Sequence, residues 1–399
     1  MALLRICVVG LGYIGLPTAL MFAKSGHKVI GFDIVESKVK DLNNGICRSE
    51  EEEVRKLFDD PEVRKNFSAD TMPHESDVFI IAVPTPVKHD TKEADLSHVV
   101  DSMNTVLKVL KKGNLVVIES TIPPGTCRDV VRPIIEKTGL KVSKDVFLAH
   151  CPEQILVGNS IHDLKNNAKI VGGVDQVSTQ KAKVLYQSFV KGQILATDDV
   201  TAEIAKVAAN AYRDVNIAFA NEVAEVCERL NVLPSEAIRL ANTNPRVHIH
   251  QPGIGVGGHC IAVDPYFIST VFPEQSRLII AARSINDGKP RIVFEKIKGE
   301  MKNGRGLKLV VCGIAYKPNL RDTRESPALV IIDLLKKDGY DVTVYDPLVY
   351  PEQEGRLSEF AKNRDALVIL VPHDSVVREL EYNYEEIRSL LTTHTILRF

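Results

Sequence analysis

Near its amino terminus the chain reads Leu4-Arg5-Ile6-Cys7-Val8-Val9-Gly10-Leu11-Gly12-Tyr13-Ile14-Gly15. The first six residues are mostly apolar and become β-branched toward their end, which predicts a short buried parallel strand. A helical pattern follows as far as Lys24, Gly26 ends it, and residues 28–32 form the next expected strand. A glycine fingerprint between a strand and a helix is typical of a dinucleotide-binding fold, in which phosphates meet the helix N-terminus.

Each glycine of this fingerprint has its own expected role. Gly10 permits a tight turn, Gly12 lets a pyrophosphate approach the backbone, and Gly15 lets the helix pack closely on the strand. Asp33 follows the second strand at the spacing of the acid that binds the adenosine ribose. Because a carboxylate there would repel a 2′-phosphate, we predict that the cofactor is NAD rather than NADP. The residues expected to bind it are Gly10, Gly12, Tyr13, Ile14, Gly15 and Asp33.

The composition is that of an ordinary globular protein. A chain of 399 residues with a net charge of −2 is long enough for two or three domains and gives no reason to expect nucleic-acid or membrane partners. The seven cysteines form no C-x-x-C pair, which favours a reducing cytoplasm over a disulfide or zinc framework. Residues 3–23 are apolar enough to suggest a signal sequence, but their glycines divide them into a strand and a helix.

Three further apolar runs predict strands, at residues 77–83, 114–119 and 146–150. Polar side chains follow these runs: Thr85, then Ser120 and Thr121, then Glu153. Ligands bind beyond the carboxyl ends of parallel strands, so we expect these side chains to face one crevice. The hydroxyl groups could equally make turns or cap helices, whereas a carboxylate at a strand end can act as a general base.

A long helix rich in alanine is predicted over residues 200–230. Its small side chains would let another helix or a cofactor lie close, so it could connect domains and take part in a dimer. Lys206 and Asn210 are four residues apart and share one face. They could stabilise a developing oxyanion, although a lone helical lysine is more often a solvated surface residue.

A second glycine-rich segment, residues 253–265, holds a single cysteine, Cys260. Glycines let the backbone approach a ligand closely, so a thiol at the end of such a loop is placed to attack what the loop holds. Asp264 could assist or could simply cap the structure that follows. Arg246 could clamp a phosphate or carboxylate or be an ordinary solvated arginine. The nearby histidines lack partners at zinc-binding spacing, so we expect no metal.

The last hundred residues repeat the opening pattern of strand, glycine turn, helix, strand and acid. Strands are expected at residues 307–313, 341–346, 365–371 and 395–399, with a helix at 328–337. The turn lacks the glycine fingerprint and carries Lys317, Arg321 and Arg324 instead, so we interpret this part as a second Rossmann-like domain for a different nucleotide. The sequence ends inside an apolar strand, and a truncated or short end is one interpretation.

We therefore predict an α/β protein in which two Rossmann-like doubly wound domains are joined by a long central helix and a helical dimerisation region. The expected domains are residues 1–198 for the NAD, 199–298 for the helices and the cysteine loop, and 299–399 for the second nucleotide.

Taken together, the motifs resemble those of the UDP-glucose/GDP-mannose dehydrogenase family. The segments in question are G-L-G-Y-I-G, A-V-P-T-P, E-S-T-I-P-P-G-T, C-P-E, A-K-V-A-A-N-A-Y, N-P-R-V, G-V-G-G-H-C-I-A-V-D-P and A-Y-K-P-N-L-R-D-T-R-E-S-P, which span the chain in order. Members oxidise the C6 alcohol of a nucleotide sugar to a carboxylate with two NAD⁺ and a covalent cysteine intermediate.

The resemblance implies a role for each matching residue. Cys260 would be the nucleophile, Lys206 and Asn210 would stabilise oxyanions, and Asp264 would act through Lys206 or water. Glu153 and Thr121 would handle water and proton transfer. Contacts to NAD are implied for Thr85, Thr121 and Arg324, and contacts to a UDP-sugar for Arg246, Gly257, Gly258, His259 and Lys317. A homodimer through the central helices is implied as well, with Arg246 reaching the substrate across its interface as one option.

Some positions differ from the UDP-glucose branch of the family. Val157 stands where that branch has a second acid, and His259 precedes the cysteine. The chain resembles enzymes for UDP-N-acetylhexosamines at Cys151-Pro152-Glu153, His259-Cys260, Pro245-Arg246-Val247 and Pro252-Gly253. Ala262-Val263 resembles the enzymes for N-acetylmannosamine more than those for N-acetylglucosamine. UDP-glucose and UDP-N-acetylglucosamine remain alternative substrates. A one-step β-hydroxyacid dehydrogenase and a non-catalytic NAD-responsive protein remain alternative functions.

Overall fold

The computed structural model describes residues 3–155, 158–302, 304, 306–353 and 355–399. It divides into one unit of residues 1–209 with 266–271 and another of residues 210–265 with 272–399. Val157, at the position of the second acid, lies outside the described residues.

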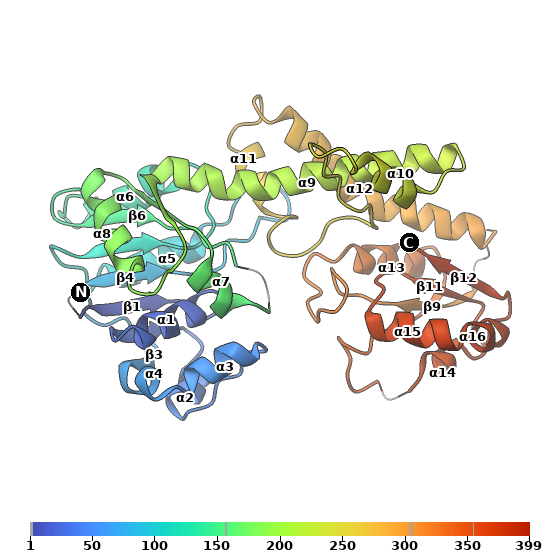
Figure 1. Ribbon diagram of the computed structural model, residues 1–399, viewed down its shortest axis with the longest axis horizontal. Coiled ribbons are helices and arrows are strands. Elements are labelled where there is room, and N and C mark those ends of the chain that lie inside the picture. Colours follow the sequence, from blue (N-terminus) through green and yellow to red (C-terminus); the bar gives the residue numbers. More distant parts are fainter. Residues whose placement is uncertain (1–2, 156–157, 303, 305, 354) are drawn as a thin grey trace. The chain divides into compact units, whose positions relative to one another are not determined.

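An eight-stranded sheet organises the first unit (Figure 1). Its strands are β1 (Arg5–Val9), β2 (Lys28–Phe32), β3 (Phe67–Asp70), β4 (Val78–Ile81), β5 (Leu115–Ile118), β6 (Phe147–His150), β7 (Lys169–Gly173) and β8 (Ile194–Asp198). Its helices are α1 (Gly15–Lys24), α2 (Glu36–Asn43), α3 (Glu52–Phe58), α4 (Pro61–Asn66), α5 (Ser97–Val106), the π-helix η1 (Cys127–Val131), α6 (Arg132–Glu136), α7 (Ser160–Asn166) and α8 (Gln176–Tyr186).

The order of the strands is that of a Rossmann fold with an extension. Six strands, in the order β3-β2-β1-β4-β5-β6, are all parallel, which is the doubly wound arrangement. The seventh strand, β7, then runs antiparallel to β6, and β8 is parallel to β7. The predicted fold class is confirmed, but the reversal at β7 was not predicted.

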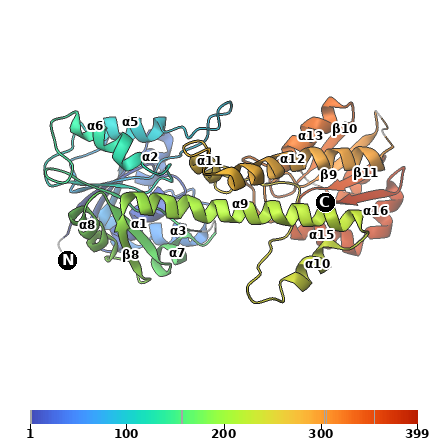
Figure 2. The ribbon, with the colours of Figure 1, turned by 90° about the horizontal axis from the view of Figure 1, so that it is seen from above.

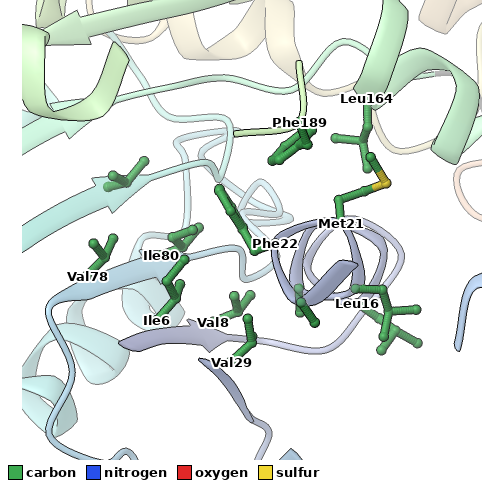
Figure 3. Close-up of a cluster of buried hydrophobic side chains, with 14 of the residues drawn as sticks. Ile6, Val8, Leu16, Met21, Phe22, Val29, Val78, Ile80, Leu164 and Phe189 are labelled. Carbon is green, nitrogen blue, oxygen red and sulfur yellow. The ribbon is translucent and has the colours of Figure 1, made fainter. Parts of the chain in front are cut away.

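Both faces of this sheet are buried, which explains the continuous apolar runs of its strands. Along β1, Ile6 and Val8 belong to one core cluster, whereas Cys7 and Val9 belong to the other. Figure 3 shows the first cluster, in which Phe22 of α1 lies toward Ile80 of β4 and Ile6 of β1, and Met21 lies beside Leu164.

The second unit holds a four-stranded parallel sheet in the order β10-β9-β11-β12. Its strands are β9 (Lys308–Cys312), β10 (Asp341–Tyr345), β11 (Ala366–Ile369) and β12 (Thr395–Arg398). Its helices are α10 (Pro234–Ala241), α12 (Arg277–Glu300), α13 (Pro327–Lys337), α14 (Leu357–Ala361), α15 (Asp374–Tyr382) and α16 (Tyr384–Leu390). Side chains of α12 and α13 cover one face of the sheet, and α14, α15 and α16 cover the other.

One long helix, α9 (Asp199–Arg229), corresponds to the alanine-rich segment (Figure 2). From Asn210 onward it belongs to the second unit, where it is bonded along α12 through pairs such as Glu225 with Lys289. A shorter helix, α11 (Asp264–Ser269), follows the cysteine loop. Among the described residues, no helix has both the length and the apolarity needed to span a membrane.

Candidate active site

The glycine loop after β1 has the shape that a pyrophosphate requires. Gly10 has a φ of +89°, and a Cβ added to it would lie 2.6 Å from the carbonyl oxygen of Ala82. A Cβ on Gly15 would lie only 1.8 Å from the carbonyl oxygen of Gly10, so this helix start tolerates no side chain. At Gly12 an added Cβ would meet nothing within 4 Å. The loop is thus packed behind and open at Gly12, which fits a dinucleotide bound against the backbone.

The acid at the end of β2 is tied to this loop. Asp33 is only 7% exposed, and its Oδ2 accepts a hydrogen bond of 2.9 Å from the backbone N–H of Leu11. Lys38 Nζ lies 2.7 Å from the same oxygen, and the N–H of Val35 donates to Oδ1 at 3.0 Å. The carboxylate therefore fixes the glycine loop, and its remaining lone pairs are what a ribose hydroxyl could use.

Hydroxyl groups join the loops that follow β4 and β5. Ser120 Oγ donates to the carbonyl oxygen of Val83 at 2.7 Å and accepts from its N–H at 2.9 Å. Thr85 Oγ1 donates to the carbonyl oxygen of Thr121 at 2.6 Å. These bonds bring the predicted Thr85 and Thr121 together at one end of the sheet. The Thr85 hydroxyl serves this loop contact in the structure.

Glu153 lies in a buried cluster of charged groups that sequence reasoning did not identify. Its Oε2 lies 2.6 Å from Nζ of Lys169, and its Oε1 accepts a 2.9 Å hydrogen bond from the N–H of Gln154. Lys169 Nζ also lies 3.4 Å from Oε1 of Glu119, to which the hydroxyl of Tyr186 donates at 2.5 Å. In the sequence, Glu119 stands just after the apolar strand β5 and Lys169 at the start of β7, and neither position indicates the other as its partner.

The predicted oxyanion residues on α9 differ in their surroundings. Lys206 is half-buried, and its ammonium group has no hydrogen-bonding partner among the residues that the structure describes. Asn210 is buried, and its Nδ2 donates a 2.6 Å hydrogen bond to Oδ2 of Asp264. The N–H of Asp264 in turn donates to the carbonyl oxygen of Cys260 at 2.8 Å. The structure therefore links Asn210, Asp264 and the cysteine turn.

The glycines before Cys260 let the loop lie against the segment between β9 and α13. The N–H of Gly258, whose φ is +83°, donates to the carbonyl oxygen of Arg324 at 3.0 Å. A Cβ on Gly257 would lie 2.6 Å from the carbonyl oxygen of Glu325, and one on Gly258 would lie 2.9 Å from the Tyr316 ring. Burial, together with the negative groups nearby, raises the pKa of Tyr316. The half-buried Cys260 therefore follows glycines that pack against the segment between β9 and α13.

Buried polar side chains of α9 and α12 hold the other end of the loop. Arg283 Nη1 lies 2.6 Å from Oδ1 of Asp214, and Asn286 Nδ2 donates to that same oxygen at 2.9 Å. Asn221 donates to Asn286 at 3.0 Å and accepts a 3.0 Å bond from the N–H of Gly253. These four side chains were not predicted, because single polar residues in a helical pattern give no sign of their partners.

The remaining predicted residues lie at the surface of the second unit. Arg246 is exposed, and its backbone N–H donates to Oδ1 of Asn244 at 3.1 Å. Lys317 is also exposed. Arg324 forms a two-pronged pair with Asp322, with both contacts from its Nε at 3.0 Å, and His259 Nδ1 lies 4.0 Å from that aspartate. Of these residues, Arg324 and His259 are thus brought together through Asp322.

The predicted site residues are distributed over both units. The first holds the glycine loop, Asp33, Thr85, Thr121, Glu153 and Lys206, and the second holds Asn210, Arg246, Gly257, Gly258, His259, Cys260, Asp264, Lys317 and Arg324. Chemically, the first offers a dinucleotide cradle with a buried carboxylate. The second offers a thiol, an amide and exposed cationic side chains.

Models of one family match nearly the whole chain. They are the NAD binding domain of the UDP-glucose/GDP-mannose dehydrogenase family at residues 4–190, its central domain at 200–288 and its UDP binding domain at 310–398. A UDP-N-acetyl-D-mannosamine dehydrogenase of Methanocaldococcus jannaschii is 44% identical over 93% of this chain and 86% of its own. One of Campylobacter jejuni is 41% identical over 94% of this chain and 96% of its own.

A solved structure agrees with these sequences. The UDP-D-ManNAc dehydrogenase of Pyrococcus horikoshii superimposes with a TM-score of 0.91 at 38% identity, covering 99% of this chain and 94% of that one. The glycine loop, which is open at Gly12, and the buried acid after β2 fit the NAD that the first domain of the family binds. The chain therefore belongs to the UDP-glucose/GDP-mannose dehydrogenase family and is an NAD-dependent UDP-sugar dehydrogenase.

Proposed function

We propose that this chain oxidises the C6 alcohol of UDP-N-acetyl-D-mannosamine to a carboxylate, in two oxidation steps joined by a covalent adduct on Cys260. The observation that carries the proposal is the cysteine turn. Its carbonyl oxygen accepts the N–H of Asp264, whose side chain holds Asn210 at 2.6 Å, so a thiol and an oxyanion-stabilising amide are fixed in one unit.

When bound, NAD supplies the hydride acceptor for both oxidations. The chain's own residues would do the rest. Lys206 and Asn210 would stabilise the alkoxide that forms as the C6 hydroxyl loses its proton, because preorganised donors lower the energy of a developing oxyanion. Asp264 keeps the amide of Asn210 oriented. Thr121 would take part in proton transfer from the alcohol.

Cys260 makes the second oxidation possible. Its sulfur would add to the aldehyde carbon to give a thiohemiacetal, whose oxyanion can expel the second hydride to leave a thioester. Water, deprotonated by Glu153, would then attack the thioester and release the sugar carboxylate and the thiolate. A general base of this kind typically contributes about 10²–10⁴-fold in rate.

Residues of the second unit would hold the nucleotide sugar. Lys317 and Arg246 are exposed cations, and the backbone of Gly257 and Gly258 approaches the loop that carries Lys317. Contact of Arg324 with the cofactor and of His259 with the sugar belongs to the same proposal. The choice of N-acetylmannosamine is supported by Ala262-Val263 and by the two relatives of that activity, at 44% and 41% identity.

We also propose that the chain forms a homodimer through α9. Tyr212, Phe219 and Val226 recur every seven residues on this helix and are 62%, 51% and 58% exposed. A stripe of large exposed apolar side chains at this spacing favours packing against a second helix. Phe219→Glu should therefore convert a dimer to a monomer in light-scattering measurements, whereas a monomeric wild-type protein would contradict the dimer.

Two further assignments belong to this proposal. We assign residues 1–198 to NAD binding, 199–298 to the helices and the cysteine loop, and 299–399 to UDP-sugar binding. We also propose that the chain works in a reducing cytoplasm, in which disulfides are rare. The seven cysteines, all within the described ranges, form no disulfide.

A panel of nucleotide sugars tests the proposal. NADH formation should be fastest with UDP-N-acetyl-D-mannosamine, and slower with UDP-N-acetyl-D-glucosamine and UDP-glucose. If turnover is fastest with UDP-N-acetyl-D-glucosamine or UDP-glucose, that sugar replaces UDP-N-acetyl-D-mannosamine as the proposed substrate. Turnover of a β-hydroxyacid instead, with one NADH for each substrate, would refute it, as would NADH binding without turnover of any UDP-sugar.

A further inference from the structure

Behind Glu153 lies a group of four buried polar side chains, the Lys169 cluster, which consists of Glu153, Lys169, Glu119 and Tyr186. Their exposed fractions are 9%, 4%, 2% and 0%, in that order. Lys169 Nζ lies 2.6 Å from Glu153 and 3.4 Å from Glu119, and 4.6 Å from the centre of the Tyr186 ring. The ammonium group is thus enclosed by two carboxyl groups and an aromatic face.

The reversal of β7 explains how Lys169 reaches this place. The antiparallel register pairs Ala149 with Gly173 and His150 with Gly172. When the same register is continued, the start of β7 comes opposite the residues after β6, and Lys169 comes opposite Glu153. If β7 were parallel to β6, its first residue would lie at the amino ends of the strands. The ligand-binding ends are the opposite, carboxyl ends.

The buried charges of the cluster stabilise one another's ionised forms. Burial by itself would lower the pKa of Lys169, but the carboxylates of Glu153 and Glu119 outweigh it and raise the pKa above its usual value. Burial raises the pKa of Glu119. Lys169 therefore remains an ammonium. A buried charge without a partner is costly, so loss of Lys169 would disfavour the ionised form of Glu153.

Other titratable groups near the cluster do not replace this cation. Burial lowers the pKa of His150 to about 3, and the charges of Lys169 and of Lys206 on α9 act in the same direction. Burial raises the pKa of Cys151. His150 and Cys151 are consequently neutral near pH 7, and among the described residues Glu153 forms its ion pair with Lys169.

We propose that Lys169 is a positioning residue that keeps Glu153 ionised and fixes its orientation for hydrolysis of the thioester. This inference rests on the proposed function. In that step the water oxygen forms a bond to the thioester carbon, the carbon–sulfur bond breaks, Cys260 leaves as a thiolate, and a water proton moves to Glu153. Glu119 and Tyr186 hold the ammonium group from its other side.

Pre-steady-state kinetics of Lys169→Met tests the proposal. Both oxidations precede hydrolysis, so the variant should release a burst of two NADH per active site and then turn over about 10²-fold more slowly than wild type, which corresponds to loss of the general base. Intact-mass spectrometry should detect the sugar thioester on Cys260. The acid limb of the hydrolysis rate should move to higher pH, and Lys169→Arg, which keeps the charge, should restore the limb.

Controls separate this role from a structural one. Lys289, which is 4% exposed and pairs with Glu225 at 2.9 Å in the other unit, is a matched buried lysine. Lys289→Met should lower stability without accumulating thioester. Lys169→Gln, which keeps a hydrogen-bond donor but no charge, carries the test if the methionine variant does not fold.

Distinct results would overturn the inference and the proposed function. Without NADH formation by the wild type on any UDP-sugar, the proposed function fails. If the wild type is active but neutral variants at position 169 give no burst, no adduct or an unmoved acid limb, Lys169 does not act through Glu153. Accumulation of the same adduct by Lys289→Met would reduce the effect to general loss of packing.

Discussion

Alanine substitutions in the first glycine loop should have separate effects on the free energy of unfolding and on the affinity for NAD. An alanine at position 12 would place its Cβ where no atom lies within 4 Å, whereas one at position 15 would place its Cβ 1.8 Å from the oxygen of Gly10. Ordinary contact begins at 3.4 Å, so Gly15→Ala forces a displacement of about 1.6 Å between helix and loop. Gly12→Ala requires no displacement of the protein.

The expected free energies follow from these distances. Overpacking of this kind costs about 1–3 kcal/mol, so Gly15→Ala should lower the free energy of unfolding and weaken NAD binding together. Gly12→Ala should leave the free energy of unfolding within about 0.5 kcal/mol of wild type or raise it slightly. Because its methyl group enters the space of the pyrophosphate, it should weaken NAD binding by about 1.4 kcal/mol or more, which is tenfold in Kd.

The assay is NAD titration by calorimetry, beside denaturant unfolding without ligand. Gly288, a helical glycine whose added Cβ also meets nothing within 4 Å, provides the matched control. Gly288→Ala should stabilise α12 by up to about 1 kcal/mol and leave the Kd for NAD unchanged. Wild-type NAD affinity in Gly12→Ala would refute the placement of the pyrophosphate against this loop.

Two further predictions concern stability. Burial raises the pKa of Glu203 from 4.5 to about 7, so its carboxyl group binds a proton more tightly in the folded chain than in the unfolded chain. About 3 kcal/mol of stability that is present below pH 4.5 should therefore be lost as the pH rises through 7. Chemical unfolding across this range should show that loss for wild type but not for Glu203→Gln, and equal slopes would contradict it. Arg283→Met removes the cationic partner of the buried Asp214, which then retains its hydrogen bond from Asn286. This should cost about 3–5 kcal/mol and speed the reaction of Cys260 with thiol reagents. An unchanged reaction rate would show that this network does not hold the loop.

The first domain was predictable because its pattern is local. The strand, the glycine loop, the helix and Asp33 lie within thirty residues, and the contacts of Gly10, Gly15 and Asp33 involve neighbours along the chain or in adjacent strands. A distant contact also exists, because the N–H of Gly158 donates to the Tyr13 hydroxyl at 3.2 Å. The continuous apolar runs correctly indicated strands buried on both faces. Local steric requirements of this kind are written directly in the sequence.

The Lys169 cluster was not predictable for the opposite reason. Glu119 and Lys169 each stand beside apolar strand residues, and neither position hints at a partner fifty residues away. The contact depends on the direction of β7, which runs against β6. Strand direction is set by the connections and packing of the whole sheet, so a single strand sequence does not specify it.

The C-terminal repeat shows how a correct pattern can have a different meaning. Asp346 accepts a 2.7 Å bond from the N–H of Ile314, as Asp33 does from Leu11. Asp346, however, is fully buried, and its Oδ2 lies 3.1 Å from Nε2 of His373. This acid therefore fixes its loop but is closed to a ribose. The difference depends on His373, which is 27 residues away.

The central claim is that Cys260 carries the sugar through a second oxidation. Its most direct test is the ratio of NADH formed to sugar consumed, measured by absorbance and mass spectrometry with limiting UDP-N-acetyl-D-mannosamine and excess NAD. The account predicts two NADH and one uronate for each sugar in the wild type, and no uronate from Cys260→Ser. One NADH for each sugar, or full uronate formation by the serine variant, would contradict it.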